Sequence, residues 1–318
     1  MFLAVCNDSP EAQQVPQLSI IVPFQRDEAA LESTLLSVLE AKTDDHELII
    51  VHSGEYSDPY QLGDDEAVVV ETEPGLSFAD QLNVAAAAAC SPFLQVLLAG
   101  TQVEAGWSDA SIECLQDPQV HAVCVPVLDT KSGDRVFGLD GRELPHRRLA
   151  KKAKSSGGPI LAGTILRRKS ALKMGGWSNA VHQDLIDLEL TLLMNALDLR
   201  YEVVEESIVK SSLPSLSPSS SNFEIGKGCG MIACAYSEIP DSGVELEPLA
   251  RRLGHLATGL MNPKLAAERL GWVLGVRDRS LVARLSDRVE KARQSLESQT
   301  VPMRTPDTAP VADRRRAA

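Results

Sequence analysis

Short runs of strand-forming residues alternate with helical patterns throughout the first half of this chain. Leu18–Pro23 and residues 93–98 are largely apolar runs of strand length, and residues 29–42 repeat their apolar side chains at helical spacing. Apolar strands separated by helices are typical of a parallel sheet that is covered on both faces. We therefore predict an α/β fold built on a mostly parallel, Rossmann-type sheet with helices on both faces.

The same patterns predict the remaining elements. Further strands are expected at residues 47–51, 67–70, 121–128 and 201–204, and helices at residues 78–90, 184–197, 223–236, 247–261, 265–273 and 280–296. The helix at 184–197 is almost wholly apolar, which indicates burial. The last helix carries an apolar stripe that we expect to dock on its own domain, with a homodimer contact through the C-terminal helices as the alternative; the stripe comprises Leu281, Leu285, Val289, Ala292 and Leu296.

Composition divides the chain into five predicted segments. They are an N-terminal extension (1–16), the α/β domain (17–212), a Ser/Pro-rich loop (213–222), a helical extension (223–298) and a disordered tail rich in Pro, Thr and Ala (299–318).

Charge and apolar content exclude several classes of partner. The 31 basic and 44 acidic residues give a formal charge of −13, which argues against nucleic acid as the main partner. No stretch approaches the ~20 apolar residues of a membrane span, and residues 1–6 lack the basic start of a signal peptide. A cytoplasmic location is expected. The six cysteines show no C-x-x-C spacing, so most of them are expected to be small core residues.

Six segments resemble a known family in the right order. They read LSIIVPFQR (18–26), ELIIVHSGEYSD (47–58), Leu82-Asn83 before an Ala run, GTILRRKSALKMGGW (163–177), HQDLIDLE (182–189) and FEIGKGCG (223–230). Together they resemble the family 2 glycosyltransferases, enzymes of the GT-A fold that use nucleotide sugars. The resemblance covers residues 17–275.

The resemblance implies two groups of binding residues. The expected donor-binding residues are Pro23, Arg26, Asp27, His52, Ser53, Asn83 and Gly100. The expected acceptor-side residues are Gly163, Arg167, Gly176 and Trp177. The partners would be a nucleotide sugar and a saccharide or lipid-linked acceptor.

The family's metal-binding Asp-x-Asp motif is absent at the matching position. That position reads Leu98-Ala99-Gly100, which offers no carboxylate to Mn²⁺ or Mg²⁺, so no divalent metal is expected there. Basic side chains can replace a metal at a phosphate. The candidates for this phosphate-neutralising role are Arg147, Arg148, Lys151 and Lys152; the alternative is a solvated basic segment.

Two acids at the start of a buried helix are candidates for the catalytic base. Asp184 and Asp187 are three residues apart and therefore share one helix face. A carboxylate in a partly apolar site can deprotonate an acceptor hydroxyl. The alternative is that both acids stabilise the helix N-terminus.

Two functions follow from these residues. The first is an inverting glycosyltransferase with a metal-independent or residual mechanism. The second is a catalytically inactive pseudo-glycosyltransferase that serves as a binding or assembly module. The family's Asp after the second strand, which binds the nucleotide base and ribose, is replaced by His52 or Ser53, and both metal-binding acids are missing as well. The run Gly226-Lys227-Gly228-Cys229-Gly230 follows no strand and is not a phosphate-binding loop.

Overall fold

The computed structural model describes residues 15–25, 27–54, 56, 62–63, 66–211, 221–246, 248 and 262–298. The expected helix at 247–261, the disordered tail and most of the Ser/Pro-rich loop lie outside these residues. Among the described residues, no helix has both the length and the apolar character needed to cross a bilayer.

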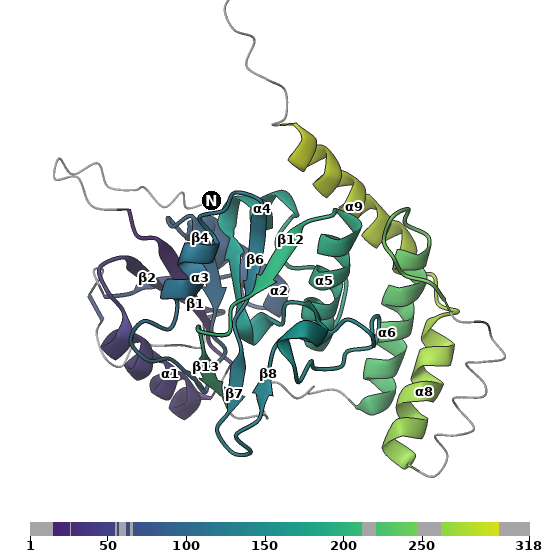
Figure 1. Cartoon of the computed structure of the whole chain (residues 1–318), viewed down its shortest axis with the longest axis horizontal. Helices are drawn as coiled ribbons and strands as arrows, with labels where there is room; N and C mark the ends of the chain where they lie inside the picture. Colours follow the sequence, from purple (N-terminus) through teal and green to yellow (C-terminus); the bar gives the residue numbers. More distant parts are fainter. Residues whose placement is uncertain are drawn as a thin grey trace, which may run out of the picture.

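A seven-stranded sheet forms the centre of the molecule, in the order β12-β6-β11-β4-β1-β2-β3 (Figure 1). All neighbouring strands are parallel except β11, which runs antiparallel to both β4 and β6. The strands are β1 (Leu18–Pro23), β2 (His46–His52), β3 (Val68–Glu71), β4 (Phe93–Val96), β6 (Val120–Cys124), β11 (Thr164–Arg167) and β12 (Arg200–Val203). The predicted mostly parallel α/β sheet is confirmed.

Helices cover the sheet because its inner strands are apolar on both faces. Every residue of β1 and β4 is buried. In Figure 1, α3 lies in front of the sheet and α2 behind it. The helices of this region are α1 (Glu28–Ala41), α2 (Phe78–Ala88), α3 (Asp109–Cys114), α4 (Arg168–Lys173) and α5 (Ile186–Ala196). As predicted, α5 is buried along almost its whole length.

The predicted strand at 121–128 is divided in two. Pro126 lacks the N–H that would continue the ladder, so β6 ends at Cys124 and β7 (Val127–Asp129) joins a different sheet. This second sheet has the order β5-β13-β7-β8. Its other strands are β5 (Thr101–Gln102), β8 (Arg135–Val136) and β13 (Val209–Ser211), and a separate two-stranded sheet pairs β9 (Leu139–Asp140) with β10 (Ser156–Gly158).

Short 3₁₀ turns connect these elements within the described residues. They are η1 (Ala153–Ser155), η2 (Leu161–Gly163) and η3 (Gln183–Leu185). The last of them leads directly into α5.

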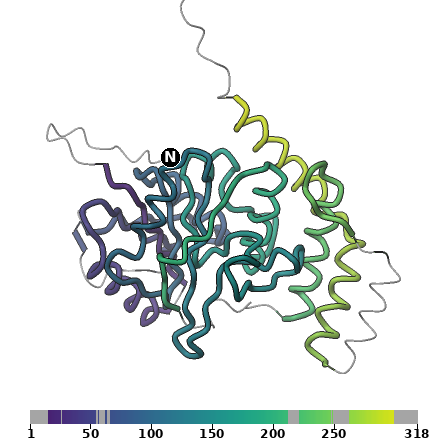
Figure 2. The backbone as a smooth tube through the Cα atoms, in the orientation of Figure 1, coloured from purple at the N-terminus to yellow at the C-terminus, as the bar shows by residue number. Residues whose placement is uncertain are grey.

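In the described part of the chain, three helices follow the sheet domain and pack on one side of it: α6 (Asn222–Ser237), α8 (Pro263–Gly275) and α9 (Val282–Glu297) (Figure 2). Glycines bring α6 and α8 into backbone contact. A Cβ at Gly226 or Gly230 would overlap the backbone of α8, and a Cβ at Gly271 or Gly275 would overlap that of α6. The glycine-rich run that began at Gly226 is therefore a helix-packing surface.

Helix α9 docks through the predicted stripe. Leu285, Val289 and Ala292 are buried within their own chain, as expected of a stripe that docks on its own domain; a homodimer contact stays a prediction. From the same helix, Arg288 donates to Glu189 Oε1 at 3.0 Å and to the carbonyl of Gly176 at 2.7 Å. Glu189 is completely buried and also accepts from the Tyr236 hydroxyl at 3.0 Å. The arginine thus links α9 to α5 and to the loop after α4.

The five described cysteines form no disulfide, and three of them are buried as predicted. Cys124, Cys229 and Cys234 are buried, whereas Cys90 is exposed. Burial raises the pKa of Cys124 and of Cys229 to about 12, which makes both thiols unreactive at neutral pH.

Replacement of Gly271 by alanine tests the helix contact. The added methyl would overlap the Phe223 carbonyl, and we expect Gly271→Ala to lower the free energy of unfolding by about 1–3 kcal/mol, despite alanine's better helix propensity. Urea denaturation measures this. Leu274→Ala on the exposed face of α8 is the control and should change stability little. Unchanged or increased stability of Gly271→Ala would contradict the backbone contact.

A buried histidine and a half-buried one predict a pH-dependent stability. Burial lowers the pKa of His46 against the raising effect of Asp109, and burial followed by Arg167 lowers the pKa of His121. Between the lowered pKa values and about 6.5, the unfolded chain binds more protons than the native one, so stability falls as pH falls through this window. Denaturation at pH 7.5 and 5.5 should show a smaller decrease for a His46→Gln/His121→Gln variant than for the wild type. Equal decreases would contradict the assignment.

Candidate functional site

The sheet has a topological switch point between β1 and β4. From β1 the chain proceeds through β2 to β3 on one side, and then returns to place β4 on the other side. In open α/β sheets, ligands bind outside the carboxyl ends of the strands at such a point. The carboxyl ends here carry Pro23 on β1, His52 on β2 and the segment 97–100 after β4. The fold therefore gathers these donor-binding candidates at one edge.

The turn after β4 is held by helix α1. The Gly100 N–H donates to the Ala30 carbonyl at 3.0 Å and to Thr34 Oγ1 at 2.9 Å, and Gly100 has a φ of +85°. Leu98 packs against the hydrophobic core. Neither Leu98 nor Ala99 offers a side-chain oxygen, so these residues do not fit a divalent metal. In the described part of the chain, no three His, Cys, Asp or Glu side chains gather into a metal site.

The other donor-side candidates at this edge have identifiable local roles. Asp27 caps α1 by accepting from the Ala30 N–H at 3.0 Å. His52 is buried, and its Nδ1 accepts from the Gly54 N–H at 3.1 Å. Ser53 follows His52 and is half-buried. Arg26 lies outside the described residues.

Asn83 lies with the acceptor-side group. Its Oδ1 accepts from the Trp177 N–H at 2.7 Å, and its Nδ2 donates to the Trp177 carbonyl at 2.9 Å. A Cβ at Gly176, whose φ is +68°, would overlap the Asn83 amide. These contacts join α2 to the loop after α4. They give Asn83, Gly176 and Trp177 a structural role that the sequence did not indicate.

Two further acceptor-side candidates also make structural contacts. Arg167 donates to the carbonyls of Leu115, Asp117 and Val120, and burial lowers its pKa. Gly163 accepts from the Val125 N–H at 2.7 Å, and any Cβ there would overlap the Val125 carbonyl. Their local partners account for these residue types without a ligand.

Asp187 is bound by an arginine from the basic run. Arg147 donates from Nε to Oδ1 at 3.0 Å and from Nη2 to Oδ2 at 2.8 Å, and the side chains are 11% and 5% exposed. Burial by itself would lower the pKa of Arg147, but the charge and hydrogen bonds of Asp187 outweigh it and raise that pKa. This bidentate pair commits the carboxylate to Arg147 and the guanidinium to Asp187.

Asp184 has a different environment. It lies in η3, its side chain is 11% exposed, and its Oδ2 is 3.3 Å from His182 Nδ1. The same Nδ1 is 3.3 Å from the Asp184 main-chain nitrogen. Of the two candidate bases, Asp184 is therefore the one whose neighbour is a histidine rather than a bidentate arginine.

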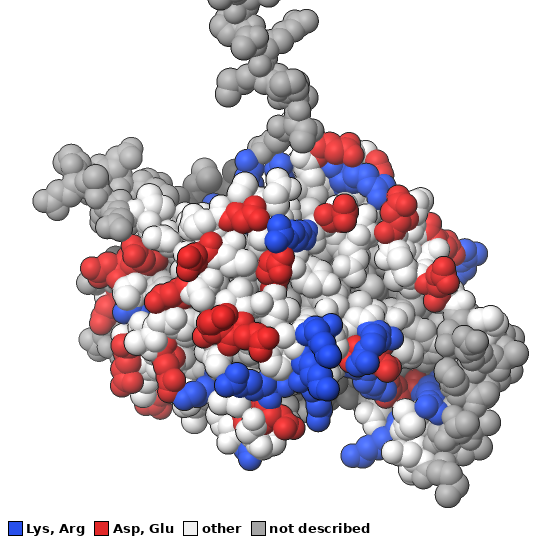
Figure 3. Space-filling model, viewed as in Figure 1, with Lys and Arg blue, Asp and Glu red and all other residues white. Residues whose placement is uncertain are grey.

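The basic run is partly committed to ion pairs. Arg148 donates to Glu268 of α8 at 2.6 Å, while the exposed Lys151 lies 3.7 Å from Asp134. Lys152 is exposed. Figure 3 shows Lys and Arg gathered in a band over the region of β7 and β8, with separate patches of Asp and Glu elsewhere on the visible face. The two lysines, more than the two arginines, are open to an anionic ligand.

No family model and no curated protein sequence matches this chain. Solved structures do match. A mannosyltransferase from Pyrobaculum calidifontis, in complex with GDP-Man and Mn²⁺, is 15% identical over 92% of this chain and 90% of that chain, with a TM-score of 0.50. Residues 1–349 of S. aureus TarS are 12% identical over 89% of this chain and 90% of that chain, with a TM-score of 0.54.

A third match is GalNAc-T7 with UDP, GalNAc and Mn²⁺. It is 14% identical over 91% of this chain and 57% of that chain, with a TM-score of 0.56. The fold is that of the GT-A glycosyltransferases. At these identities the likeness shows the fold, and the membership in family 2 stays a prediction.

Sequence reasoning missed several contacts between segments of the site that are far apart in the sequence. Glu268, Thr34 and the Arg147–Asp187 pair were not anticipated, because each contact joins segments whose approach depends on the topology. The sequence did contain one signal for the contact between α6 and α8. Gly226 and Gly230 on α6, and likewise Gly271 and Gly275 on α8, are four residues apart, which is the spacing of one helix face.

Removing Asp187 tests its commitment to Arg147. We expect Asp187→Ala to lower the free energy of unfolding by about 3–5 kcal/mol, because it leaves a buried guanidinium without its counter-ion. Asp184→Ala, whose partner His182 has a side chain that is 53% exposed, should cost clearly less. Urea denaturation of both variants gives the comparison. Equal and small losses in the two variants would show that the Arg147–Asp187 pair contributes little to the free energy of unfolding.

Proposed function

We propose that this chain transfers a sugar from a nucleotide sugar to an acceptor hydroxyl, with inversion and without a metal held by an Asp-x-Asp motif. The observation that carries the proposal is that two neighbouring acids have different partners. Asp187 is neutralised by Arg147, while Asp184, directly before the buried helix α5, pairs with His182. Support for a sugar nucleotide comes from the GT-A fold, whose matched structures include complexes with GDP-Man and UDP.

In this mechanism Asp184 is the general base. It would accept the proton of the acceptor hydroxyl as that oxygen bonds to the anomeric carbon. The bond from that carbon to the diphosphate oxygen breaks on the opposite face, and the nucleoside diphosphate leaves with the electron pair. The configuration is thereby inverted.

The departing diphosphate needs positive charge. Lys151 and Lys152 are the better candidates within the basic run, because Arg147 and Arg148 already bind Asp187 and Glu268. Two ammonium groups would neutralise the developing negative charge as a metal does in other transferases. The donor itself would lie at the switch point, against Pro23, His52 and the turn at Gly100.

A catalytically inactive binding module is the second candidate. The observation that favours it is the turn at 98–100, which is apolar and hydrogen-bonded to α1. Donor binding and stabilisation of the leaving group provide much of a transferase's rate acceleration. A chain that does both poorly can therefore keep the fold and lose catalysis.

Substitution of Asp184 tests the proposal. The wild type is incubated with UDP-, GDP- and TDP-sugars together with candidate acceptors, and release of nucleoside diphosphate is measured. We expect Asp184→Asn to lower kcat by about 10²- to 10⁴-fold. Asp287→Asn, on the exposed face of α9, is the matched control and should keep the wild-type rate. An unchanged rate in Asp184→Asn would exclude it as the base, and no release from any donor would favour the inactive module.

A further inference from the structure

The second sheet carries basic side chains on its outer strands. Lys210 on β13 is in register with Leu128 on β7, and Leu128 is in register with Arg135 on β8. Residues in register on neighbouring strands share one face of a sheet, so Lys210 and Arg135 lie on the same face. Lys131 lies in the turn between β7 and β8, and both Lys131 and Arg135 are exposed. Lys210 is paired with Glu104.

Two lysines of a later segment, Lys151 and Lys152, extend this surface. The Phe137 N–H donates to the Ala150 carbonyl at 2.9 Å, which places the residues after Ala150 beside β8. Lys151 lies 3.7 Å from Asp134, in the segment between β7 and β8, and both lysines are exposed. We use the name β8 basic surface for the surface formed by Lys131, Arg135, Lys151 and Lys152. Figure 3 shows the band of Lys and Arg over this region.

The segment that carries the β8 basic surface is positive within an acidic protein. Residues 130–155 include eight basic and three acidic residues, whereas the whole chain has a formal charge of −13. At physiological ionic strength, the interaction between exposed charges is largely screened beyond about 8–10 Å. A partner that touches the β8 basic surface is therefore attracted by the local positive charge, and the acids on other faces repel it little.

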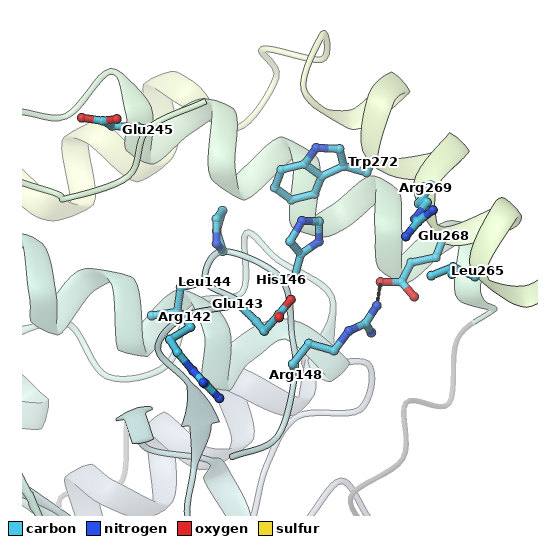
Figure 4. A pocket seen from close by; sticks show the side chains of 11 residues that line it. Arg142, Glu143, Leu144, His146, Arg148, Glu245, Leu265, Glu268, Arg269 and Trp272 are labelled. Atoms are coloured by element: carbon cyan, nitrogen blue, oxygen red, sulfur yellow. Dashed lines mark hydrogen bonds and ion pairs between the residues drawn. The ribbon is translucent and has the colours of Figure 1, made fainter. Parts of the chain in front are cut away.

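The cations of this surface that have no acid partner are mostly lysines. Three arginines of the same segment already bind acids, in the pairs Arg142–Asp140, Arg147–Asp187 and Arg148–Glu268 (Figure 4). Among the described residues, Lys131, Arg135 and Lys152 form no ion pair. A guanidinium binds one phosphate or carboxylate in a fixed geometry, whereas an ammonium group acts as a point charge on a flexible stem. A set of such charges suits an extended anionic surface.

Other anionic partners need features that residues 130–155, all of which the structure describes, do not offer. Single-stranded nucleic acids stack their bases on aromatic side chains. Phe137 is the one Phe, Tyr or Trp of this segment, and it is buried. A protein interface has an apolar centre, but the neighbouring Val136 is buried as well. The headgroups of an anionic bilayer need neither feature, because charge alone attracts lysine and arginine to them.

We propose that the β8 basic surface binds the anionic headgroups of a lipid bilayer and holds the chain reversibly at a membrane surface. The hairpin of β7 and β8 projects beyond the central sheet in Figure 1, which gives Lys131 access to a flat surface. This binding does not depend on the proposed transferase reaction, because it uses neither Asp184 nor the switch point. Lys151 and Lys152 also have the proposed phosphate-neutralising role, so the test leaves them unchanged.

Flotation of the full chain with lipid vesicles tests the proposal. Vesicles of phosphatidylcholine alone, and of phosphatidylcholine with about 30% phosphatidylserine, are compared at about 50 and 300 mM NaCl. We expect binding to the anionic vesicles only, and weaker binding at the higher salt concentration. Lys131→Ala/Arg135→Ala should bind the anionic vesicles about 25-fold more weakly, which is about fivefold for each cation removed.

A matched variant removes the same charge elsewhere. Lys169→Ala/Lys291→Ala replaces exposed lysines of α4 and α9, which lie far from β8 in Figure 1, and should bind as the wild type does. Lys131→Glu is a second variant of the β8 basic surface that leaves strand β8 intact. Its main-chain N–H donates to Asp129 at 3.2 Å and is kept in the variant, so the turn should fold and vesicle binding should weaken.

The outcomes separate this surface from a general effect of charge. Weaker binding in both variants of the β8 basic surface, with wild-type binding in Lys169→Ala/Lys291→Ala, supports the proposal. No binding to the anionic vesicles at low salt overturns it, and so does an equal loss in all variants. Tighter binding of duplex DNA than of anionic vesicles, at the same salt concentration, would identify nucleic acid as the partner and also overturn it. Vesicle binding without any sugar transfer keeps this inference and removes the proposed function.

Discussion

Two buried carboxylates on helix α5 organise this protein. Asp187 and Glu189 are almost completely buried, and each is paired with an arginine from a distant part of the chain. Because an unpaired buried charge costs several kcal/mol, Arg147 must reach α5 from the loop before β10, and Arg288 must reach it from α9. The loop and the C-terminal helices are thereby fixed on one scaffold. The candidate base Asp184 lies in η3, directly before this helix.

The central sheet was predictable because its strands carry their own signal. Strands that are buried on both faces read as continuous apolar runs, so β1 and β2 were placed within a residue or two of their observed bounds. The second sheet was not predictable in this way. Its strands have two or three residues, and their pairing depends on how β7 leaves the main sheet after Pro126.

The candidate site was predictable in part. Residues at strand ends, such as Pro23 and His52, reach one edge because parallel strands end there together. Side chains within the other motifs served different purposes. Asn83 and Trp177 hold each other, and the glycines from Gly226 onward pack a helix. A motif written in one segment does not reveal which distant segment it contacts, and the Arg147–Asp187 pair, 40 residues apart, shows why.

The proposed function requires that the switch point between β1 and β4 bind a nucleotide without a divalent metal. Calorimetric titration of the full chain with UDP, GDP and TDP, each with and without Mn²⁺, tests it most directly. The account predicts that one nucleoside diphosphate binds with the same Kd in both conditions, because the turn at 98–100 offers no metal ligand. Binding that requires Mn²⁺, or no binding of any of the three, would contradict it.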